Sequence, residues 1–364
     1  MKIDKLKAYP LAIDRSEVFK IATGSSLTAE NVYVLAESGE LFGWGNACPN
    51  GVTQETTESI LKMLRYSRNT VESCEFEVPE LWDDIMDKYP KDPSATAGLD
   101  IALYDLKGKM EERQIYELRG GKNKGVLTDR TIGIMNLSDT VEHAREFAAK
   151  DFKALKIKIG LDLLEDIRRV RAVREVVGKK FPLWVDANQG YSVEEAITLC
   201  EKLADIGVEF IEQPVNENDL EGLKRVTEET TIPIMADEPV KDHLMTENIC
   251  SREIADMINI KLMKCGGLTG AWKIVDVLED YGVDAMVGCM GEDVPAIAAG
   301  VHLCLTTSKI KYADLDSHFM LSDRVFEGLK FDKGKLWLSG EPGLGVEASE
   351  SKLKKYHMDL EAVV

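Results

Sequence analysis

The chain has 364 residues, and 44% of them are hydrophobic, so it is long enough to bury a sizeable core in one large domain or two. The 64 acidic residues outnumber the 45 basic ones and give a formal net charge of −19, which argues against nucleic acid or an anionic membrane as the main partner. No apolar N-terminal signal or bilayer-spanning run is visible. We therefore expect a cytoplasmic protein, with reduced thiols at the unpaired positions Cys48, Cys74, Cys200, Cys250, Cys265, Cys289 and Cys304.

The first part of the chain is expected to form a small antiparallel sheet followed by helices. Hydrophobic residues alternate over 31–35 and 41–44, with a turn at 37–40 between the two runs. From about Thr56 to Leu118 the apolar spacing becomes helical. The glycine-rich stretch 120–125 matches neither dinucleotide nor Walker phosphate-loop patterns, so it is interpreted as a linker.

Beyond the linker, short apolar runs alternate with helix-like stretches. The expected strands and helices include 130–134, 139–150, 154–159, 163–177, 284–287 and 311–314. After Asp316 the pattern becomes irregular, with a Pro/Gly turn at 341–345. This tail is expected to return to the N-terminal part.

Charged residues recur at the ends of these apolar runs. Successive members are 24 to 28 residues apart, which is the length of a βα unit, and they are Lys158 (with Lys156 two residues earlier), Asp186, Glu212, Asp237 and Lys261. In a parallel (β/α) barrel the active site lies at the C-terminal ends of the strands, so these residues should face one cavity.

An ordinary explanation for each single residue is a solvated strand end. Lys-X-Lys in an apolar strand, however, puts two ammonium groups on one face, which a plain core would not tolerate. Three carboxylates without histidine or cysteine are the oxygen ligands that suit Mg²⁺, with Mn²⁺ as a similar substitute. The sequence therefore predicts a metal site flanked by lysines that carry protons.

These residues and their neighbours carry a family resemblance. The motifs Lys-X-Lys, Val-Asp-Ala-Asn-Gln-Gly, Ile-Glu-Gln-Pro, Ala-Asp-Glu and Asn-Ile-Lys-Leu-Met-Lys-Cys-Gly-Gly together resemble the enolase superfamily, in its muconate-lactonizing-enzyme-like group. The resemblance covers essentially the whole chain. It implies an α/β fold, a modified (β/α)7β TIM barrel at 126–318, with an α+β capping domain built from 1–125 and the C-terminal segment 319–364.

The same resemblance implies that Asp186, Glu212 and Asp237 bind Mg²⁺ and that Lys158 and Lys261 stand on opposite faces of the substrate. Superfamily members remove a proton next to a carboxylate and stabilise the enediolate with Mg²⁺. Lys156, and Lys264 if it faces the site, would favour loss of a proton from the catalytic lysines. The group includes epimerases, cycloisomerases, o-succinylbenzoate synthases and N-acylamino acid racemases, and a catalytically silent metal-binding scaffold is a further alternative.

The sequence Asp314-Leu-Asp316 narrows this choice. An isolated Asp-X-Asp is usually a turn, but here it falls at the expected end of the last barrel strand. There it resembles the Asp-X-Asp of dipeptide epimerases, which holds the α-ammonium group of the substrate. We therefore expect an isomerase, a dipeptide epimerase that inverts an α-carbon by two-base 1,1-proton transfer.

Three further positions are predicted to shape the substrate site together with Lys156. Gly24 stands where the Ala-Glu epimerases carry an arginine, and Gly291 stands where they carry a bulkier residue, which would leave room. Asp293 either selects a cationic side chain or caps the following helix, and Lys20 is expected on the surface. We therefore expect Ala-Glu to be a poor substrate and L,L-dipeptides with a larger apolar or basic second residue to be better. The sequence leaves a homo-oligomer open.

Overall fold

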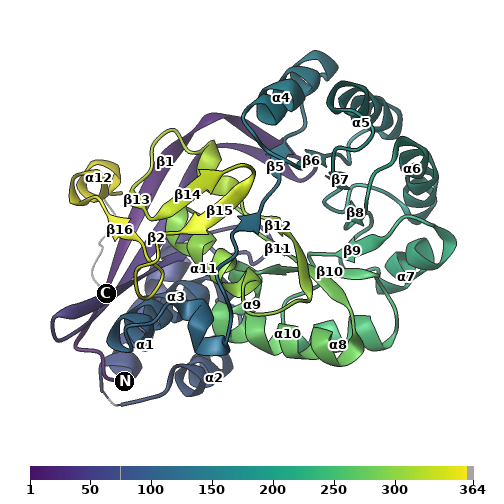
Figure 1. Ribbon diagram of the computed structural model, residues 1–364. Helices are drawn as coiled ribbons and strands as arrows, with labels where there is room; N and C mark the ends of the chain where they lie inside the picture. Colours follow the sequence, from purple (N-terminus) through teal and green to yellow (C-terminus); the bar gives the residue numbers. More distant parts are fainter. Residues whose placement is uncertain (74, 359–364) are drawn as a thin grey trace.

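The computed structural model describes residues 1–73 and 75–358, and Figure 1 shows an antiparallel sheet domain beside a barrel ringed by helices. Cys74 lies outside the described residues. The other six cysteines are free thiols, of which five are buried and Cys289 is partly exposed. The expectation of free thiols is thus confirmed for the residues that the structure describes.

The N-terminal domain is a three-stranded antiparallel sheet covered by helices, as the sequence predicted. The sheet has the order β1 (Lys5–Ile21), β2 (Gly24–Ser38) and β3 (Leu41–Ala47). The helices are α1 (Thr57–Ser73), α2 (Val78–Lys88), α3 (Pro93–Met110) and the 3-10 turn η1 (Ile115–Arg119). Helix α3 packs so closely on β3 that Gly45 has no room for a side chain: a Cβ atom there would stand 1.9 Å from the Gly98 carbonyl oxygen.

Eight parallel strands form a nearly closed barrel with neighbours in chain order. They are β5 (Arg130–Ile132), β6 (Leu155–Lys158), β7 (Leu183–Asp186), β8 (Ile211–Glu212), β9 (Ile234–Ala236), β10 (Met257–Lys261), β11 (Asp284–Gly288) and β12 (Ile310–Asp314). The Asp129 amide donates to the Ala313 carbonyl oxygen at 3.1 Å, which joins the first strand region to the last.

Each of the first seven barrel strands is followed by at least one helix, whereas the eighth strand, β12, leads directly into the C-terminal segment. This arrangement confirms the expected (β/α)7β barrel. They are α4 (Leu137–Ala149), α5 (Leu163–Val177), α6 (Val193–Ile206), α7 (Leu220–Glu229), α8 (His243–Ser251), α9 (Leu262–Cys265), α10 (Leu268–Tyr281) and α11 (Val294–Cys304).

Side chains two residues before the charged strand ends fill the barrel interior. Trp184 precedes Asp186 by two positions and Phe210 precedes Glu212 likewise, and the two rings stack at 5.1 Å. Ala154, Met235, Met257 and Met286 complete this cluster, with Tyr312 packed against it. Residues two positions apart in a strand point to the same side, so the charged residues also point into the barrel. They form the next layer, closer to the C-terminal ends of the strands.

The segment beyond the barrel lies against the N-terminal sheet. It contains η2 (Ser317–Met320), β13 (Phe326–Glu327), β14 (Leu329–Asp332), β15 (Lys335–Leu338), β16 (Glu347–Ala348) and α12 (Glu350–Tyr356). The Phe326 ring stacks on Tyr33 at 5.1 Å, and β15 pairs with β4 (Val126–Leu127). Val126 and Leu127 therefore share a sheet with the tail, and the domain boundaries at 125 and 318 stay a prediction.

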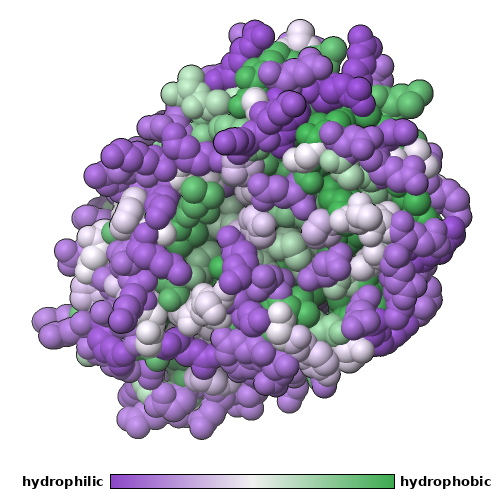
Figure 2. All heavy atoms as spheres, turned by 45° about the vertical axis from the view of Figure 1, so that its right-hand side comes forward, coloured by the Kyte–Doolittle hydropathy of each residue, from purple (hydrophilic) through white to green (hydrophobic). Residues whose placement is uncertain are grey.

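Hydrophilic side chains dominate the face shown in Figure 2, with smaller hydrophobic areas between them, as the net charge of −19 leads one to expect. Among the described residues, no helix combines the length and the apolar character needed to cross a membrane.

Candidate functional site

A cavity of about 690 Å³ lies where the β1–β2 hairpin meets the C-terminal ends of the barrel strands. Its wall includes Lys158 and Lys261 from the barrel and Phe19 and Gly24 from the hairpin. The strand ends are level with one another, since Lys158 pairs in register with Asp186 and Asp186 with Glu212. The predicted convergence of charged strand ends at one cavity is therefore found.

Three carboxylates at this level form a candidate metal centre. Asp186 ends β7, Glu212 ends β8 and Asp237 follows β9, and their side chains are buried. One oxygen of each lies within 4.8 Å of an oxygen of the other two. An all-oxygen set with three formal negative charges fits Mg²⁺.

The charges around these carboxylates perturb their ionisation. Burial opposes ionisation of Asp186, but the ammonium groups of Lys158 and Lys156 outweigh it and hold the pKa of Asp186 below its usual range. Burial, together with the nearby charge of Asp186, raises the pKa of Glu212 to about 7. Opposed pKa shifts in neighbouring carboxylates show that their negative charges repel one another. A bound divalent cation would compensate these charges.

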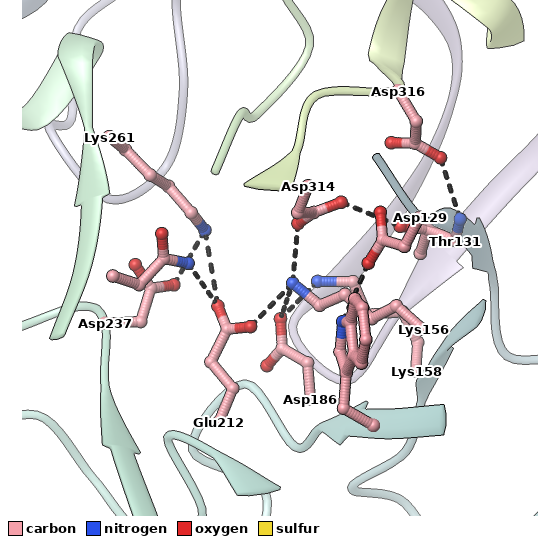
Figure 3. Close-up of polar contacts among 12 residues, drawn as sticks. Asp129, Thr131, Lys156, Lys158, Asp186, Glu212, Asp237, Lys261, Asp314 and Asp316 are labelled. Carbon is pink, nitrogen blue, oxygen red and sulfur yellow. Dashed lines mark hydrogen bonds and ion pairs between the residues drawn. The ribbon is translucent and has the colours of Figure 1, made fainter. Parts of the chain in front are cut away.

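The two predicted catalytic lysines lie on either side of the carboxylates (Figure 3). Lys158 Nζ is 2.5 Å from Asp186 Oδ2 and donates to Asn188 Oδ1 at 3.1 Å. Lys261 Nζ is 2.7 Å from Asp237 Oδ2. Because β6 and β10 are separated by three strands of the barrel, the lysines approach the cavity from opposite sides.

Lys156 lies deeper than predicted. Its side chain is completely buried, and its Nζ is 2.6 Å from Glu212, 2.7 Å from Asp314 and 3.2 Å from Asp186. Burial opposes its charge, but Asp314, Glu212 and Asp186 keep its pKa well above the usual range. It is not part of the cavity wall, and its ammonium group is shared by three carboxylates of the chain. Asp314 and Asp316 do not line the wall either, so a contact between Lys156 and the substrate stays a prediction.

The second supporting lysine faces the site. Lys264 is 2% exposed, and its Nζ lies 2.6 Å from Asp237 Oδ1 and donates to the Asp237 carbonyl oxygen. The surface location that the sequence left open for it is excluded. Burial lowers the pKa of Lys264, while Asp237 opposes that effect. At Lys261, burial favours the neutral form, but Asp237 and Glu212 outweigh burial and nearby cations, so its pKa is raised.

The two aspartates of Asp-X-Asp lie together behind the cavity wall. Asp314 accepts from Thr131 Oγ1 at 3.1 Å, and Asp316 accepts from the Thr131 amide at 2.7 Å and from Arg130 at 2.9 Å. Ligand atoms of Asp314, Asp316 and Cys289 lie within 4.8 Å of one another, and Cys289 lines the cavity. The pair thus meets at one spot, although Arg130 already compensates one of the two charges.

Two of the predicted specificity positions differ from expectation. Gly24 is open, with nothing within 4 Å of a Cβ atom added there, but a Cβ at Gly291 would stand 3.1 Å from Arg15 Nη2. A Cβ atom at Gly291 would thus crowd the Arg15 guanidinium group, while Gly291 itself lines the cavity. Asp293 is fully buried and accepts from the Tyr33 hydroxyl at 2.8 Å, so it faces the N-terminal sheet and neither lines the cavity nor caps α11 through its side chain. Lys20 is exposed, as expected.

Sequence reasoning missed Arg15, which lines the cavity. Its Nε donates to Ser26 Oγ at 3.1 Å, and its side chain is 9% exposed. Burial lowers the pKa of Arg15, and the nearby acidic groups, Asp316 and Glu292 among them, oppose this effect. In the sequence it stands between Asp14 and Ser16 and looks like any surface arginine, so no local pattern could have identified it.

Comparison with known proteins shows matches along nearly the whole chain. The N-terminal domain family of mandelate racemase and muconate lactonizing enzyme matches residues 10–120, and the enolase C-terminal domain-like family matches residues 139–352.

Individual relatives match over almost their full length. The hydrophobic dipeptide epimerase of Enterococcus faecalis is 37% identical over 95% of this chain and 99% of its own. The L-Ala-D/L-Glu epimerase of Bacillus subtilis is 35% identical over 95% of this chain and 97% of its own. The crystal structure of the dipeptide epimerase from E. faecalis V583, complexed with Mg and the dipeptide L-Leu-L-Tyr, superposes with a TM-score of 0.92 at 36% identity, covering 95% of this chain and 99% of that one.

Proposed function

Because the chain belongs to the mandelate racemase/muconate lactonizing enzyme family of the enolase superfamily, we propose that it is a Mg²⁺-dependent dipeptide epimerase. As a member of this group it is an isomerase that acts on amino acid derivatives. The observation that carries the proposal is the pair Lys158 and Lys261 on opposite sides of the carboxylates Asp186, Glu212 and Asp237.

The two lysines explain inversion of an α-carbon. One lysine, in its neutral form, takes the α-proton from one face, and the other, in its protonated form, delivers a proton to the opposite face. The net result is a 1,1-proton transfer that leaves the two lysines with exchanged protonation states. A bound Mg²⁺ would neutralise the negative charge that develops on the substrate carboxylate during this transfer.

The buried aspartate pair supports a substrate with a free α-ammonium group. A carboxylate offers about four acceptor positions, so Asp314 keeps acceptor capacity beyond its contacts with Lys156 and Thr131. Cycloisomerase, o-succinylbenzoate synthase and N-acylamino acid racemase substrates present no such cation, which makes two carboxylates beside the cavity less useful to them.

The cavity wall supports an apolar second residue, whereas a basic one would meet Arg15 as well as the carboxylates of Glu30 and Glu217. Its apolar residues include Phe19, Ile21, Val52 and Met290. Asp293, the acidic group that favoured Lys or Arg, faces away, and a second cation beside Arg15 would be repelled.

Arg15 also favours a second candidate, a dipeptide with an acidic second residue. The exclusion of Ala-Glu rested on the absence of an arginine at Gly24, and Arg15 brings a guanidinium group to the same cavity from another position. We place the apolar class first, because the Arg15 guanidinium is already engaged with Ser26 and lies 5.7 Å from the Phe19 ring.

A deuterium-exchange screen tests both candidates. L,L-dipeptides with apolar, acidic and basic second residues are incubated with the enzyme and Mg²⁺ in D₂O, and mass spectrometry records one-deuteron incorporation. We expect exchange with apolar dipeptides first, and none with N-acylated amino acids at matched concentration. Exchange confined to N-acylated amino acids would assign a racemase, and no exchange with any member would favour a scaffold. The Lys158→Ala/Lys261→Ala double variant is the control for enzyme-independent exchange.

A further inference from the structure

A buried carboxyl group outside the predicted set lies beneath the aspartate pair. Asp129 precedes β5 and is completely buried. Trp184 Nε1, from the apolar layer inside the barrel, donates to Asp129 Oδ2 at 2.7 Å. The other oxygen, Oδ1, receives no hydrogen bond from any donor among the described residues. Figure 3 shows the carboxyl group of Asp129 reaching that of Asp314.

Two buried carboxyl groups in contact cannot both be ionised without strong repulsion. Lys156 Nζ lies 2.7 Å from Asp314 Oδ2, and it keeps Asp314 charged, with a pKa lowered despite burial. Burial first, and then the charges of Asp314 and Asp316, raise the pKa of Asp129 well above its usual range, opposed by Lys156. The proton of the pair therefore resides on Asp129.

We propose that Asp129 is a positioning residue whose protonated carboxyl group donates a hydrogen bond to Asp314 and fixes the aspartate pair for the α-ammonium group of the substrate. This rests on the proposed dipeptide epimerase function. The protonated carboxyl group satisfies both neighbours at once, because Oδ2 accepts from Trp184 while the hydroxyl group donates to Asp314.

A neutral donor suits this position better than a cation. Asp314 already binds Lys156, and Asp316 already binds Arg130, so a further positive charge would cancel what remains for the ammonium group. A hydrogen bond from a neutral carboxyl group orients Asp314 and leaves its charge in place. The contact with Trp184 ties this orientation to the rigid apolar layer of the barrel.

Two matched substitutions separate positioning from simple packing. Asp129→Asn keeps the size, an acceptor for Trp184 and an N–H donor for Asp314, whereas Asp129→Leu keeps only the size. We expect Asp129→Asn to stay within about threefold of the wild type in KM for a dipeptide, and Asp129→Leu to raise KM about tenfold or more with kcat changed far less. Equal losses in both variants, or a loss in kcat alone, would overturn the proposal.

Infrared spectroscopy tests the protonation state without any turnover. The wild-type minus Asp129→Asn difference spectrum at neutral pH should contain the C=O band of one protonated carboxyl group, and only a carboxylate band there would refute the proposal. This readout holds even if Asp129→Leu fails to fold, which its thermal unfolding curve would reveal. If the wild type epimerised no dipeptide, the proposed function would fail while the infrared result still decided the state of Asp129.

Discussion

Replacing Arg15 by Met should change which dipeptides the enzyme accepts. The substitution removes the only positive charge that the hairpin side of the described cavity wall contributes, and keeps a side chain of similar length. A hydrogen bond to a charged group contributes about 1.5–3 kcal/mol, which corresponds to roughly ten- to 150-fold in kcat/KM. If Arg15 pairs with an acidic second residue, kcat/KM for Ala-Glu should fall by that factor.

Apolar and basic substrates should respond differently to the same change. An apolar side chain makes no ionic contact with Arg15, so kcat/KM for Ala-Leu should stay within about threefold. A basic side chain is repelled by Arg15, so Ala-Lys should improve. The assay is initial-rate epimerisation of the three dipeptides, followed by polarimetry or deuterium exchange.

Lys20→Met is the matched control, because Lys20 belongs to the same strand but is exposed and outside the cavity wall. Lys20→Met should leave the ratios of kcat/KM among Ala-Glu, Ala-Leu and Ala-Lys unchanged. If Arg15→Met left every ratio unchanged as well, Arg15 would not face the second side chain. If Ala-Lys were the best substrate of the wild type, the electrostatic argument itself would be refuted.

Four further outcomes are expected. Chelation should abolish epimerisation and Mg²⁺ should restore it, and Asp186→Asn, Glu212→Gln or Asp237→Asn should each weaken metal affinity in calorimetry, since each removes one negative charge; full turnover without metal would contradict the site. Lys158→Ala and Lys261→Ala should lose α-proton exchange with opposite stereoisomers, and loss with the same isomer would rule out two opposed bases. Asp314→Asn with Asp316→Asn should lower kcat/KM for dipeptides by roughly ten- to a hundredfold per lost carboxylate, without a matching loss for N-acylated amino acids. Finally, burial lowers the pKa of His302 to about 4, so the unfolded chain should bind one more proton than the folded chain between this pH and about 6.5. Lowering the pH through this range should therefore destabilise the fold by up to about 3 kcal/mol. His302→Gln should flatten this part of the stability–pH curve measured by thermal unfolding.

The parts of the site that could be predicted from the sequence are those that obey the barrel periodicity. Asp186, Glu212 and Lys261 end their strands, and the regular βα spacing places such residues at one level around one axis. Two-residue alternation also predicted that Lys156 and Lys158 point the same way, and both contact Asp186. The depth at which the Lys156 ammonium group lies in the barrel could not be predicted, because it depends on which carboxylates of other strands this side chain reaches.

The misjudged residues owe their positions to contacts between distant parts of the chain. Asp293 follows β11 but bonds Tyr33 in the N-terminal sheet, 260 residues away. The approach of Arg15 to Gly291 could not be predicted, because Arg15 comes from the first strand. Asp129 lies in the short connection before β5, where neither helical nor strand periodicity says which way a carboxyl group points.

The β1–β2 hairpin and the segment that follows Asp316 are joined by backbone contacts, so substitutions in one can affect the other. The pairing of β1 with β2 shifts register between Asp14 and Phe19, and Arg15 lies in this shifted stretch. There Arg15 forms an antiparallel bridge with Leu321, and the Ser322 amide donates to the Asp14 carbonyl oxygen at 2.8 Å. Leu321 follows Asp316 through the single turn η2.

A displacement of Asp316 would therefore be transmitted over a few residues to the strand that carries Arg15, and the reverse holds as well. Substitutions that share a backbone connection of this kind are not expected to act additively. The groups that would select the α-ammonium and the second side chain are thus coupled to each other through the segment after β12. The lysines that would transfer the proton and the carboxylates that would hold Mg²⁺ lie at the ends of barrel strands and not in the hairpin. Specificity can therefore change at the hairpin while the chemistry is preserved.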